Sequence, residues 1–292
     1  MFGIDGHSGL DFTILGIPFE GPSAPLGPAL APASIRSAAA RYGNSSGSAS
    51  PIMVYNPERG YLLKEVSLGD VGDVPRSSSR LEVERHVDAA WGQLDGSRPA
   101  VLGGDHFVSY PVVRRIQGPL TVIHFDAHGD LLDDFEASPH GSVMRAISSL
   151  ENVSRVIHVG LRGNLNTGEG IAWSQAQGNL VFTATDCLHL KPEQIHATIT
   201  PGERLYLTFD VDVLDPSVAP GTGTPEPGGI DYRTAIDLVT GFVKRGELVG
   251  FDIVEVNPNL DVNDHTSLLA ANLFIEVMGS WSIDRHAKDE TR

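Results

Sequence analysis

The sequence predicts a three-layer α/β fold, in which helices cover both faces of a central, mostly parallel sheet. Short apolar, β-branched runs alternate with longer segments of helical pattern from one end of the chain to the other, which is typical of repeated βα units. The low-complexity stretch 43–50 is only eight residues long, so it is typical of a surface loop and not of a linker between domains. We therefore expect residues 1–292 to form a single domain.

The individual elements follow from hydrophobic patterning. Seven runs are short and apolar enough to be strands: 12–17, 100–102, 120–125, 155–159, 180–183, 205–211 and 248–254. Six longer segments have helical patterns: 32–42, 80–94, 110–116, 192–197, 232–244 and 267–278. Pro32 in the first turn of the first helix and Thr266 as an N-cap of the last one favour these starts.

Charge and cysteine content limit the class of protein. The chain carries 37 acidic and 21 basic residues, a net charge of −16, which would repel phosphate backbones and anionic membranes. We therefore expect no nucleic-acid or membrane partner.

No apolar run reaches the length of a membrane span, and the N-terminus lacks the pattern of a secretory signal. Cys187 is the only cysteine, so no intrachain disulfide can form, which is consistent with a cytoplasmic location.

Three of the predicted strands end in unusually polar segments, and in folds of this class ligands bind beyond the carboxyl ends of the strands. The segments are Gly-Gly-Asp-His at 103–106, Asp-Ala-His-Gly-Asp at 126–130 and Asp-Val-Asp at 210–212. Side chains alternate between the faces of a strand, so the polar residues of 126–130 lie on one side if the extended conformation continues.

Carboxylates crowded together in a buried place repel one another, and a divalent cation relieves that repulsion. The candidate ligands are His106, Asp126, His128, Asp130, Asp210 and Asp212. Two imidazoles and four carboxylates form a hard set of nitrogen and oxygen ligands, which suits manganese and related ions. Structural zinc sites are typically rich in thiolates, and this set has none. The plainer alternative is that these are separate turn and cap residues.

Three neighbouring features are expected to be structural. His124 has the same parity as the ligands, but it lies deeper in its strand and is interpreted as a hydrogen-bonded core histidine. Asp215 is expected to cap the turn before Pro216. The Gly/Pro-rich run 219–229 is expected to be an ordered loop that shapes the pocket wall.

Several segments resemble the ureohydrolases, the superfamily of arginase, agmatinase and related guanidino-compound amidinohydrolases. They are GGDH at 103–106, DAHGD at 126–130, the HG of SPHGS at 138–142, FDVDVLDPSVAPGTGTPEPGG at 209–229 and DIVEVNP at 252–258. GIPFE at 16–20 and HVGLRG at 158–163 extend the resemblance over nearly the whole chain. The 209–229 block is more similar to the agmatinase branch than to arginase proper.

The resemblance implies an arginase-like αβα fold with a sheet of about eight strands and two manganese ions per chain. One ion would be held by His106, Asp126, Asp130 and Asp210, and the other by Asp126, His128, Asp210 and Asp212. Asp126 and Asp210 would then bridge the ions. Two such ions can lower the pKa of a shared water and deliver hydroxide to a guanidinium carbon. All six positions are intact, which argues against a non-catalytic relative.

Two further residues match catalytic positions of the family. His140, in the loop after the metal strand, matches the histidine assigned to proton transfer, which the departing amine requires. Glu255 matches the glutamate that receives the substrate guanidinium, because a carboxylate can accept paired N–H bonds from that planar cation. Without the resemblance, we would interpret His140 as a surface histidine. We would interpret Glu255 as a buried, hydrogen-bonded glutamate.

The resulting hypothesis is a dimanganese amidinohydrolase that releases urea from a guanidino compound, with agmatine, which would give putrescine, as the first candidate. Alternatives are 4-guanidinobutyrate or a guanidino-bearing secondary metabolite as substrate. A metal-dependent deacetylase, thought to share the fold, and a non-catalytic metal-binding relative are less favoured. The family also implies a homo-oligomer, a trimer or a hexamer.

The preference for agmatine rests on charge near the expected pocket. The loop 131–139 holds three carboxylates and no basic residue, and it joins Asp130 to His140. Carboxylates there would attract a distal ammonium group and repel a distal carboxylate; the alternative is that they face solvent and only cap turns. The stretch 25–32 lacks two arginines that are usual in the agmatinase branch, and Phe107 stands where a serine is usual.

Overall fold

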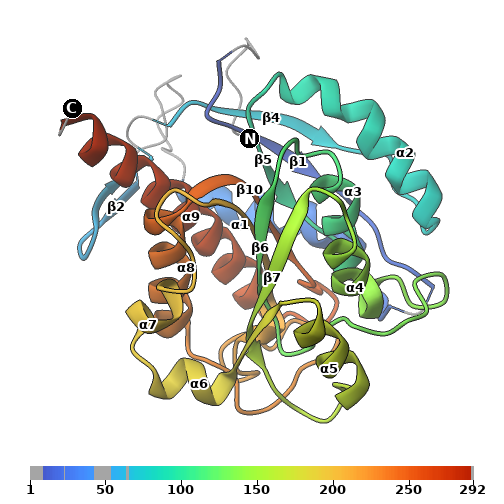
Figure 1. Ribbon diagram of the computed structural model, residues 1–292. Helices are drawn as coiled ribbons and strands as arrows, with labels where there is room; N and C mark the ends of the chain where they lie inside the picture. Colours follow the sequence, from blue (N-terminus) through green and yellow to red (C-terminus); the bar gives the residue numbers. More distant parts are fainter. Residues whose placement is uncertain (1–8, 23, 43–53, 64–65, 291–292) are drawn as a thin grey trace.

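The computed structural model describes residues 9–22, 24–42, 54–63 and 66–290 (Figure 1). Its centre is an all-parallel, eight-stranded sheet with the strand order β4-β1-β5-β10-β9-β6-β7-β8. The strands are β1 (Phe12–Gly16), β4 (Leu68–Asp73), β5 (Arg98–Leu102), β6 (Leu120–Phe125), β7 (Val153–Leu161), β8 (Leu180–Thr183), β9 (Arg204–Asp210) and β10 (Glu247–Val254). The sheet confirms the predicted fold class, and all seven predicted strands occur, with ends shifted by at most two residues.

The sequence pattern missed three strands. The edge strand β4 reads LGDVGD, and its carboxylates Asp70 and Asp73 pair with Arg36. An edge strand with acidic residues has no apolar run to mark it. The antiparallel hairpin β2 (Val54–Asn56) and β3 (Gly60–Leu62) has strands of three residues each, which are too short for a periodic signal.

Helices cover both faces of the sheet (Figure 1). They are α1 (Ala31–Ala39), α2 (Arg80–Ala90), α3 (Ser109–Val113), α4 (Val143–Ser148), α5 (Gly168–Ala176), α6 (Ala184–His189), α7 (Pro192–His196), α8 (Tyr232–Arg245) and α9 (His265–Glu290). Apolar side chains of α1 and α6–α9 pack on one face, and those of α2–α5 pack on the other. The six predicted helices are present. The short helices α4–α6 were not predicted.

The start of α9 differs from the prediction. The helix begins at His265, and its first backbone N–H groups are bound by Asp261, which accepts from Thr266 and Ser267 at 2.8 Å each. The predicted Thr266 cap is therefore wrong. The Thr266 hydroxyl instead accepts from Gly221 N at 2.8 Å, and so fixes the 219–229 loop to the helix. No helix in the described part of the chain is long and apolar enough to span a membrane.

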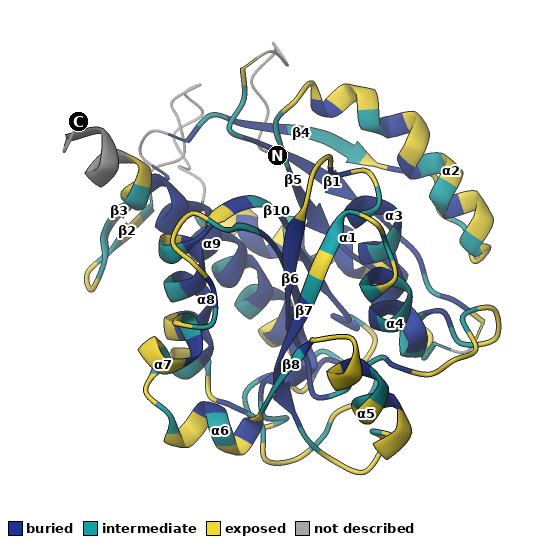
Figure 2. Cartoon of the chain, viewed as in Figure 1, coloured by how far each residue is buried: buried dark blue, intermediate teal, exposed yellow. Residues whose placement is uncertain are grey.

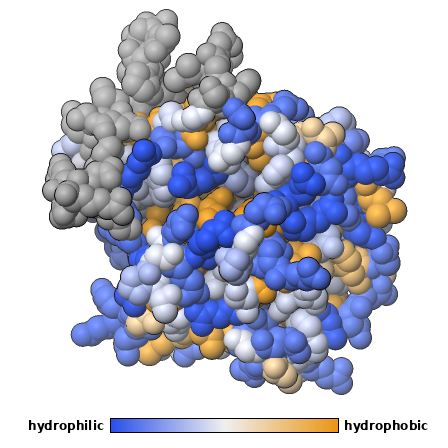
Figure 3. All heavy atoms as spheres, turned by 45° about the horizontal axis from the view of Figure 1, so that its top comes forward, coloured by the Kyte–Doolittle hydropathy of each residue, from blue (hydrophilic) through white to orange (hydrophobic). Residues whose placement is uncertain are grey.

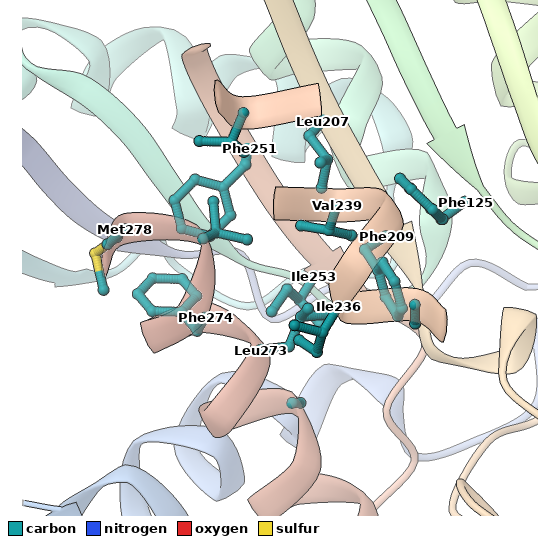
Figure 4. Packing of buried hydrophobic residues seen from close by; sticks show 14 of the residues in the cluster. Phe125, Leu207, Phe209, Ile236, Val239, Phe251, Ile253, Leu273, Phe274 and Met278 are labelled. Atoms are coloured by element: carbon teal, nitrogen blue, oxygen red, sulfur yellow. The ribbon is translucent and has the colours of Figure 1, made fainter. Parts of the chain in front are cut away.

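The buried residues lie in the sheet and on the sheet-facing sides of the helices (Figure 2), and the face drawn in Figure 3 is largely hydrophilic with apolar patches. On the α8 and α9 side, Phe209 and Phe251 point toward residues of those helices (Figure 4); the Phe251 and Phe274 rings are 4.8 Å apart. This packing fixes β9 and β10, which pair in register so that Val254 lies beside Asp210. The residues that follow both strands therefore emerge at the same edge of the sheet.

Candidate metal centre and active site

The carboxyl ends of β5, β10, β9 and β6, four adjacent strands, bring the candidate ligands together. His106 follows β5, residues 126–130 follow β6, and residues 210–212 follow or end β9. The predicted convergence holds, but the extended conformation does not continue: β6 ends at Phe125, and Asp130 has a left-handed φ of 51°. A turn, and not strand alternation, directs these side chains to one place.

The first cluster surrounds His106. Its Nδ1 lies 3.0 Å from Asp126 Oδ2 and 3.2 Å from Asp130 Oδ2. The same nitrogen is 3.4 Å from Asp210 Oδ2. Nδ1 is buried and has no hydrogen-bond partner of good geometry among the described residues. A nitrogen that faces three carboxylates without such a partner is in the position of a metal ligand.

The second cluster surrounds His128 and shares Asp126 with the first. His128 Nδ1 lies 3.0 Å from Asp212 Oδ2 and 3.4 Å from Asp126 Oδ1. The two oxygens of Asp126 therefore face different histidines. The donor atoms of Asp126, His128 and Asp212 lie within 4.8 Å of one another, which is compatible with a common cation.

The electrostatics of the six residues favour a bound cation. Burial and neighbouring carboxylates raise the pKa of Asp130 and Asp210 well above the ordinary value, and the pKa of Asp212 is also raised. Burial opposes the charged form of His128, but hydrogen bonding to Asp126 and Asp212 raises its pKa to about 12. The pKa of Asp126 is held well below its ordinary value, because the surrounding histidines outweigh its burial. Without a metal, these carboxylates remain ionised together only at a cost in free energy.

This charge pattern predicts how pH affects the metal-free fold. Groups whose pKa is raised by folding hold protons that the unfolded chain releases, so their stabilising effect is lost as pH rises. Asp126 and the buried His124, His140 and His158 have the opposite sign, but their contributions are complete above about pH 8. The melting temperature of the chelated protein should therefore fall between about pH 8 and about pH 10, because His128 still holds its proton there, whereas saturating Mn²⁺ should flatten this dependence. Thermal unfolding with and without chelator measures it, and a chelated protein that becomes more stable over that range would contradict the assignment.

The turn that carries His106 depends on a close backbone approach. A Cβ on Gly104 would lie 1.9 Å from the carbonyl oxygen of Phe19. The next residue, Asp105, is buried and accepts from Gly21 N at 2.7 Å and Phe107 N at 3.1 Å. Asp105 therefore joins this turn to the loop after β1, and only the histidine of the Asp-His pair faces the candidate ligands.

Gly104→Ala should destabilise the fold and weaken metal binding together. The added methyl group forces Phe19 and the His106 turn apart, and overpacking of this kind costs about 1–3 kcal/mol. Chemical denaturation and Mn²⁺ titration of the metal-free protein measure the two effects. Gly92→Ala is the matched control, because a Cβ there meets nothing within 4 Å; equal behaviour of the two variants would refute the steric argument.

A buried hydrogen-bond chain ends on Asp126. His124 Nε2 lies 2.9 Å from Asp126 Oδ2, and His124 Nδ1 lies 2.8 Å from His158 Nδ1. His158 Nε2 is 3.0 Å from Ser174 Oγ, which accepts from Asn179 Nδ2 at 3.0 Å. Burial lowers the pKa of both histidines, so both are neutral. His124 thus has the hydrogen bonds of the predicted core histidine, although its position also allows it to join the first cluster.

The chain has one consistent direction. Ionised Asp126 only accepts, so His124 Nε2 carries the proton and His124 Nδ1 accepts from His158. His158 Nε2 then accepts from the Ser174 hydroxyl. His158 was missed as a site residue, because its position in HVGLRG does not reveal a partner on another strand. Its contact arises from the β6–β7 register, which places His124 beside His158.

His158→Leu should lower Mn²⁺ affinity, but by less than the about 10–100-fold that is usual for losing a direct partner of a metal ligand, because His158 acts on Asp126 through His124. His158→Gln should retain most of the affinity, because the glutamine amide can donate to His124 while its oxygen accepts from Ser174. Calorimetric titration of the metal-free variants measures the affinity, and melting temperatures control for folding. Wild-type affinity in His158→Leu would show that the chain does not orient Asp126.

The two catalytic candidates take different places around the clusters. His140 begins a 3-10 turn (His140–Ser142) and lines a pocket of about 240 Å³ beside His128 and Asp130. Burial and the nearby His106 lower the pKa of His140. Glu255 does not line this pocket. It is buried, has a left-handed φ of 63°, and its Oε1 accepts from His106 N at 2.8 Å.

The strained backbone of Glu255 is informative. A non-glycine residue with positive φ costs free energy and persists where its surroundings require it. Burial and the neighbouring Asp210 raise the pKa of Glu255 well above the ordinary value. A bound cation would restore its ionised form.

The loop 131–139 lines the pocket with Leu131, Leu132 and Ser138. Its carboxylates do not line the pocket: Asp134 accepts from Ala137 N at 2.9 Å in a turn, and Glu136 pairs with Arg80. The absence of these carboxylates from the pocket lining favours the alternative of solvent-facing residues, and the preference for agmatine stays a prediction. Composition alone does not show the direction of a side chain.

Phe107, the residue that departs from the family pattern, packs behind this loop. It is fully buried, and its ring centroid lies 5.1 Å from that of Phe19 and 5.8 Å from that of Phe135. Phe107 therefore supports the loop that forms one pocket wall, and it does not enter the pocket.

Asp215 caps a turn, as predicted. It accepts from the backbone N–H groups of Ser217, Gly228 and Gly229 at 2.9–3.1 Å. These bonds close the Gly/Pro-rich loop, and Thr224 of that loop lines the pocket.

Arg162 was missed by sequence reasoning. Its guanidinium donates to the carbonyl oxygens of Asp212 at 2.6 Å, Glu226 at 2.7 Å and Leu214 at 3.2 Å. One cation therefore ties the turn that carries Asp212 to the pocket loop. The motif HVGLRG contains Arg162, but nothing in the sequence indicates that it binds carbonyl groups.

Comparison with known proteins agrees with this geometry. The Arginase family model matches residues 10–279. A guanidinobutyrase of Pseudomonas aeruginosa is 34% identical over 92% of this chain and 86% of that protein. The mitochondrial agmatinase of Gallus gallus is 34% identical over 92% of this chain and 81% of that protein.

Solved structures show the same fold. A hypothetical agmatinase from Burkholderia thailandensis has a TM-score of 0.80 and 26% identity, over 99% of this chain and 90% of that one. The proclavaminate amidino hydrolase from Streptomyces clavuligerus has a TM-score of 0.81 and 26% identity, over 94% of this chain and 93% of that one. From its sequence match and its sheet with histidines and carboxylates at the strand ends, the chain belongs to the arginase family.

Proposed function

We propose that this protein is a manganese-dependent hydrolase that cleaves a guanidino compound to an amine and urea, with residues 1–292 as one catalytic domain. The observation that carries the proposal is the shared carboxylate Asp126, whose two oxygens face His106 and His128. A single-metal site needs only one such cluster. The similar proteins named guanidinobutyrase and agmatinase support a guanidino substrate.

In this proposal the six clustered residues hold two cations. His106, Asp126, Asp130 and Asp210 would hold one, and Asp126, His128, Asp210 and Asp212 would hold the other. Two divalent cations at these residues would supply a lowered pKa for a water and polarisation of the substrate. The N/O donor set, without a thiolate, is compatible with manganese, which the family resemblance implies.

The chain's own residues bind the substrate and move the proton. Glu255 does not line the pocket of about 240 Å³, so its role rests on the family resemblance: the planar guanidinium would bind its carboxylate and stabilise the ionised form. His140 lines the pocket and holds the proton that the departing amine needs, because an amide anion is too basic to leave unprotonated. The pocket walls, fixed by Asp215 and Arg162, orient the remainder of the substrate.

Urea detection tests the proposal. Protein purified with Mn²⁺ is incubated with agmatine, 4-guanidinobutyrate, 3-guanidinopropionate and arginine, and with alkylguanidines. We expect urea from at least one compound and none with Asp126→Ala. Absence of urea from the whole panel, with both cations bound, would refute the function; acetate release from acetylated polyamines would instead indicate a deacetylase.

We also propose a cytoplasmic homo-oligomer, a trimer or a hexamer, as the family resemblance implies. Light scattering after gel filtration measures the mass of the assembly. A monomer at micromolar concentration would contradict this part of the proposal.

A further inference from the structure

We propose that the preferred substrate is a guanidine whose distal end is uncharged and apolar, such as an alkyl or aryl group. This inference rests on the proposed function, because it concerns the outer part of the same pocket. It differs from agmatine, which carries a distal ammonium group, and from 4-guanidinobutyrate, which carries a distal carboxylate group.

The outer wall of the pocket holds no charge. Apart from His128, Asp130 and His140, every described residue that lines it is neutral. The apolar members are Leu131, Leu132, Leu165 and Ile171. A charged distal group would gain no partner of opposite charge from these neutral residues, and any part of its hydration that it lost against them would be unfavourable.

The amide of one polar member of the wall, Asn166, is already engaged. Asn166 Oδ1 accepts from Gly129 N at 2.8 Å, and its Nδ2 donates to Ala127 O at 3.0 Å and Arg162 O at 2.6 Å. These bonds hold the wall in place. Asn166 therefore supplies shape, and it has no remaining group aimed at a substrate ion.

The start of α5 does not change this balance. A helix N-terminus attracts anions, but Thr167 Oγ1 already accepts from Gly170 N at 3.1 Å. Glu169 adds a negative charge in the first turn. The two effects oppose each other, so the helix start offers no net attraction for a distal carboxylate.

The pocket mouth has two leucines that water reaches. Leu132 is 41% exposed and Leu165 is 62% exposed, and they come from separate loops that both line the pocket. An apolar distal group that covers them removes apolar surface from water on both sides of the contact. The nearby Glu136 is held by Arg80 and does not offer its charge to the pocket.

A matched set of substrates tests the inference. n-Pentylguanidine replaces the terminal ammonium of agmatine with a methyl group of similar size, and 4-guanidinobutyrate supplies the anionic end. We expect kcat/KM for n-pentylguanidine to exceed that of both charged compounds by about tenfold or more, because a buried methyl group and the avoided desolvation of an ion each favour it.

Charge placed at the mouth should redirect this preference. Leu165→Asp should raise kcat/KM for agmatine relative to n-pentylguanidine, and Leu165→Lys should do the same for 4-guanidinobutyrate. Leu188→Asp is the matched control, since Leu188 is 53% exposed on α6 and does not line the pocket. This control should leave the order of substrates unchanged.

The outcomes separate the two proposals. A wild-type preference for agmatine or for 4-guanidinobutyrate over n-pentylguanidine overturns the apolar-substrate inference while leaving the guanidino hydrolase intact. Failure of the two Leu165 variants to shift the order also overturns it, because Leu165 would then not face the substrate. Absence of urea from every compound overturns both proposals.

Discussion

Asp126→Ala should abolish urea formation and remove metal from both clusters. The carboxylate is fully buried, and its two oxygens lie 3.0 Å from His106 and 3.4 Å from His128. Its loss leaves each cluster without the group that they share. Metal analysis and urea release on the same preparation measure the effect.

Asp210→Ala should be similarly damaging if Asp210 also bridges, whereas Asp133→Ala, a change of an exposed carboxylate on the neighbouring loop, should leave metal content and turnover unchanged. Near-normal turnover in Asp126→Ala or Asp210→Ala would show that the bridging assignment is incorrect.

His140→Asn should lower kcat by about 10²–10⁴-fold, the usual contribution of a general acid or base, while both cations remain bound. We expect kcat to fall while the metal content is unchanged, because His140 lines the pocket but belongs to neither cluster of candidate ligands. Steady-state kinetics and metal analysis of the purified variant measure it.

The matched control is His189→Asn, since His189 is exposed on α6 and its Nδ1 lies 2.8 Å from Thr185 O within that helix. Loss of both cations from His140→Asn would move His140 into the ligand set. An unchanged kcat would exclude it from proton transfer.

Much of the sheet could be predicted because its strands are buried. β6 has six consecutive buried residues, so apolar composition alone identifies it. β4 could not be found in this way, because its acidic residues face Arg36 at the edge of the sheet. The prediction of strands depended on runs of buried apolar residues. It failed for β4, where acidic residues form ion pairs.

The candidate ligands lie close together, but for a reason that partly differs from the prediction. Spacing of two residues suggested a continued strand, but Asp130 has a left-handed φ and reaches His106 from a turn. The sequence did show which metal-binding residue types follow the strands. The path of the backbone between them was not evident.

The supporting contacts could not be predicted from the sequence. His158 meets His124 through the register of two strands, and Arg162 meets the carbonyl groups of a loop far along the chain. Such contacts depend on how elements are placed in three dimensions. The direction of Glu136, which turns to Arg80 and away from the pocket, is a further example.

The metal stoichiometry of the active protein tests the binuclear site most directly. Protein purified with Mn²⁺ and freed of loosely bound metal should contain about two Mn²⁺ per chain, and chelation should remove both the metal and the release of urea together. A value near one Mn²⁺ per chain at full activity would contradict the account.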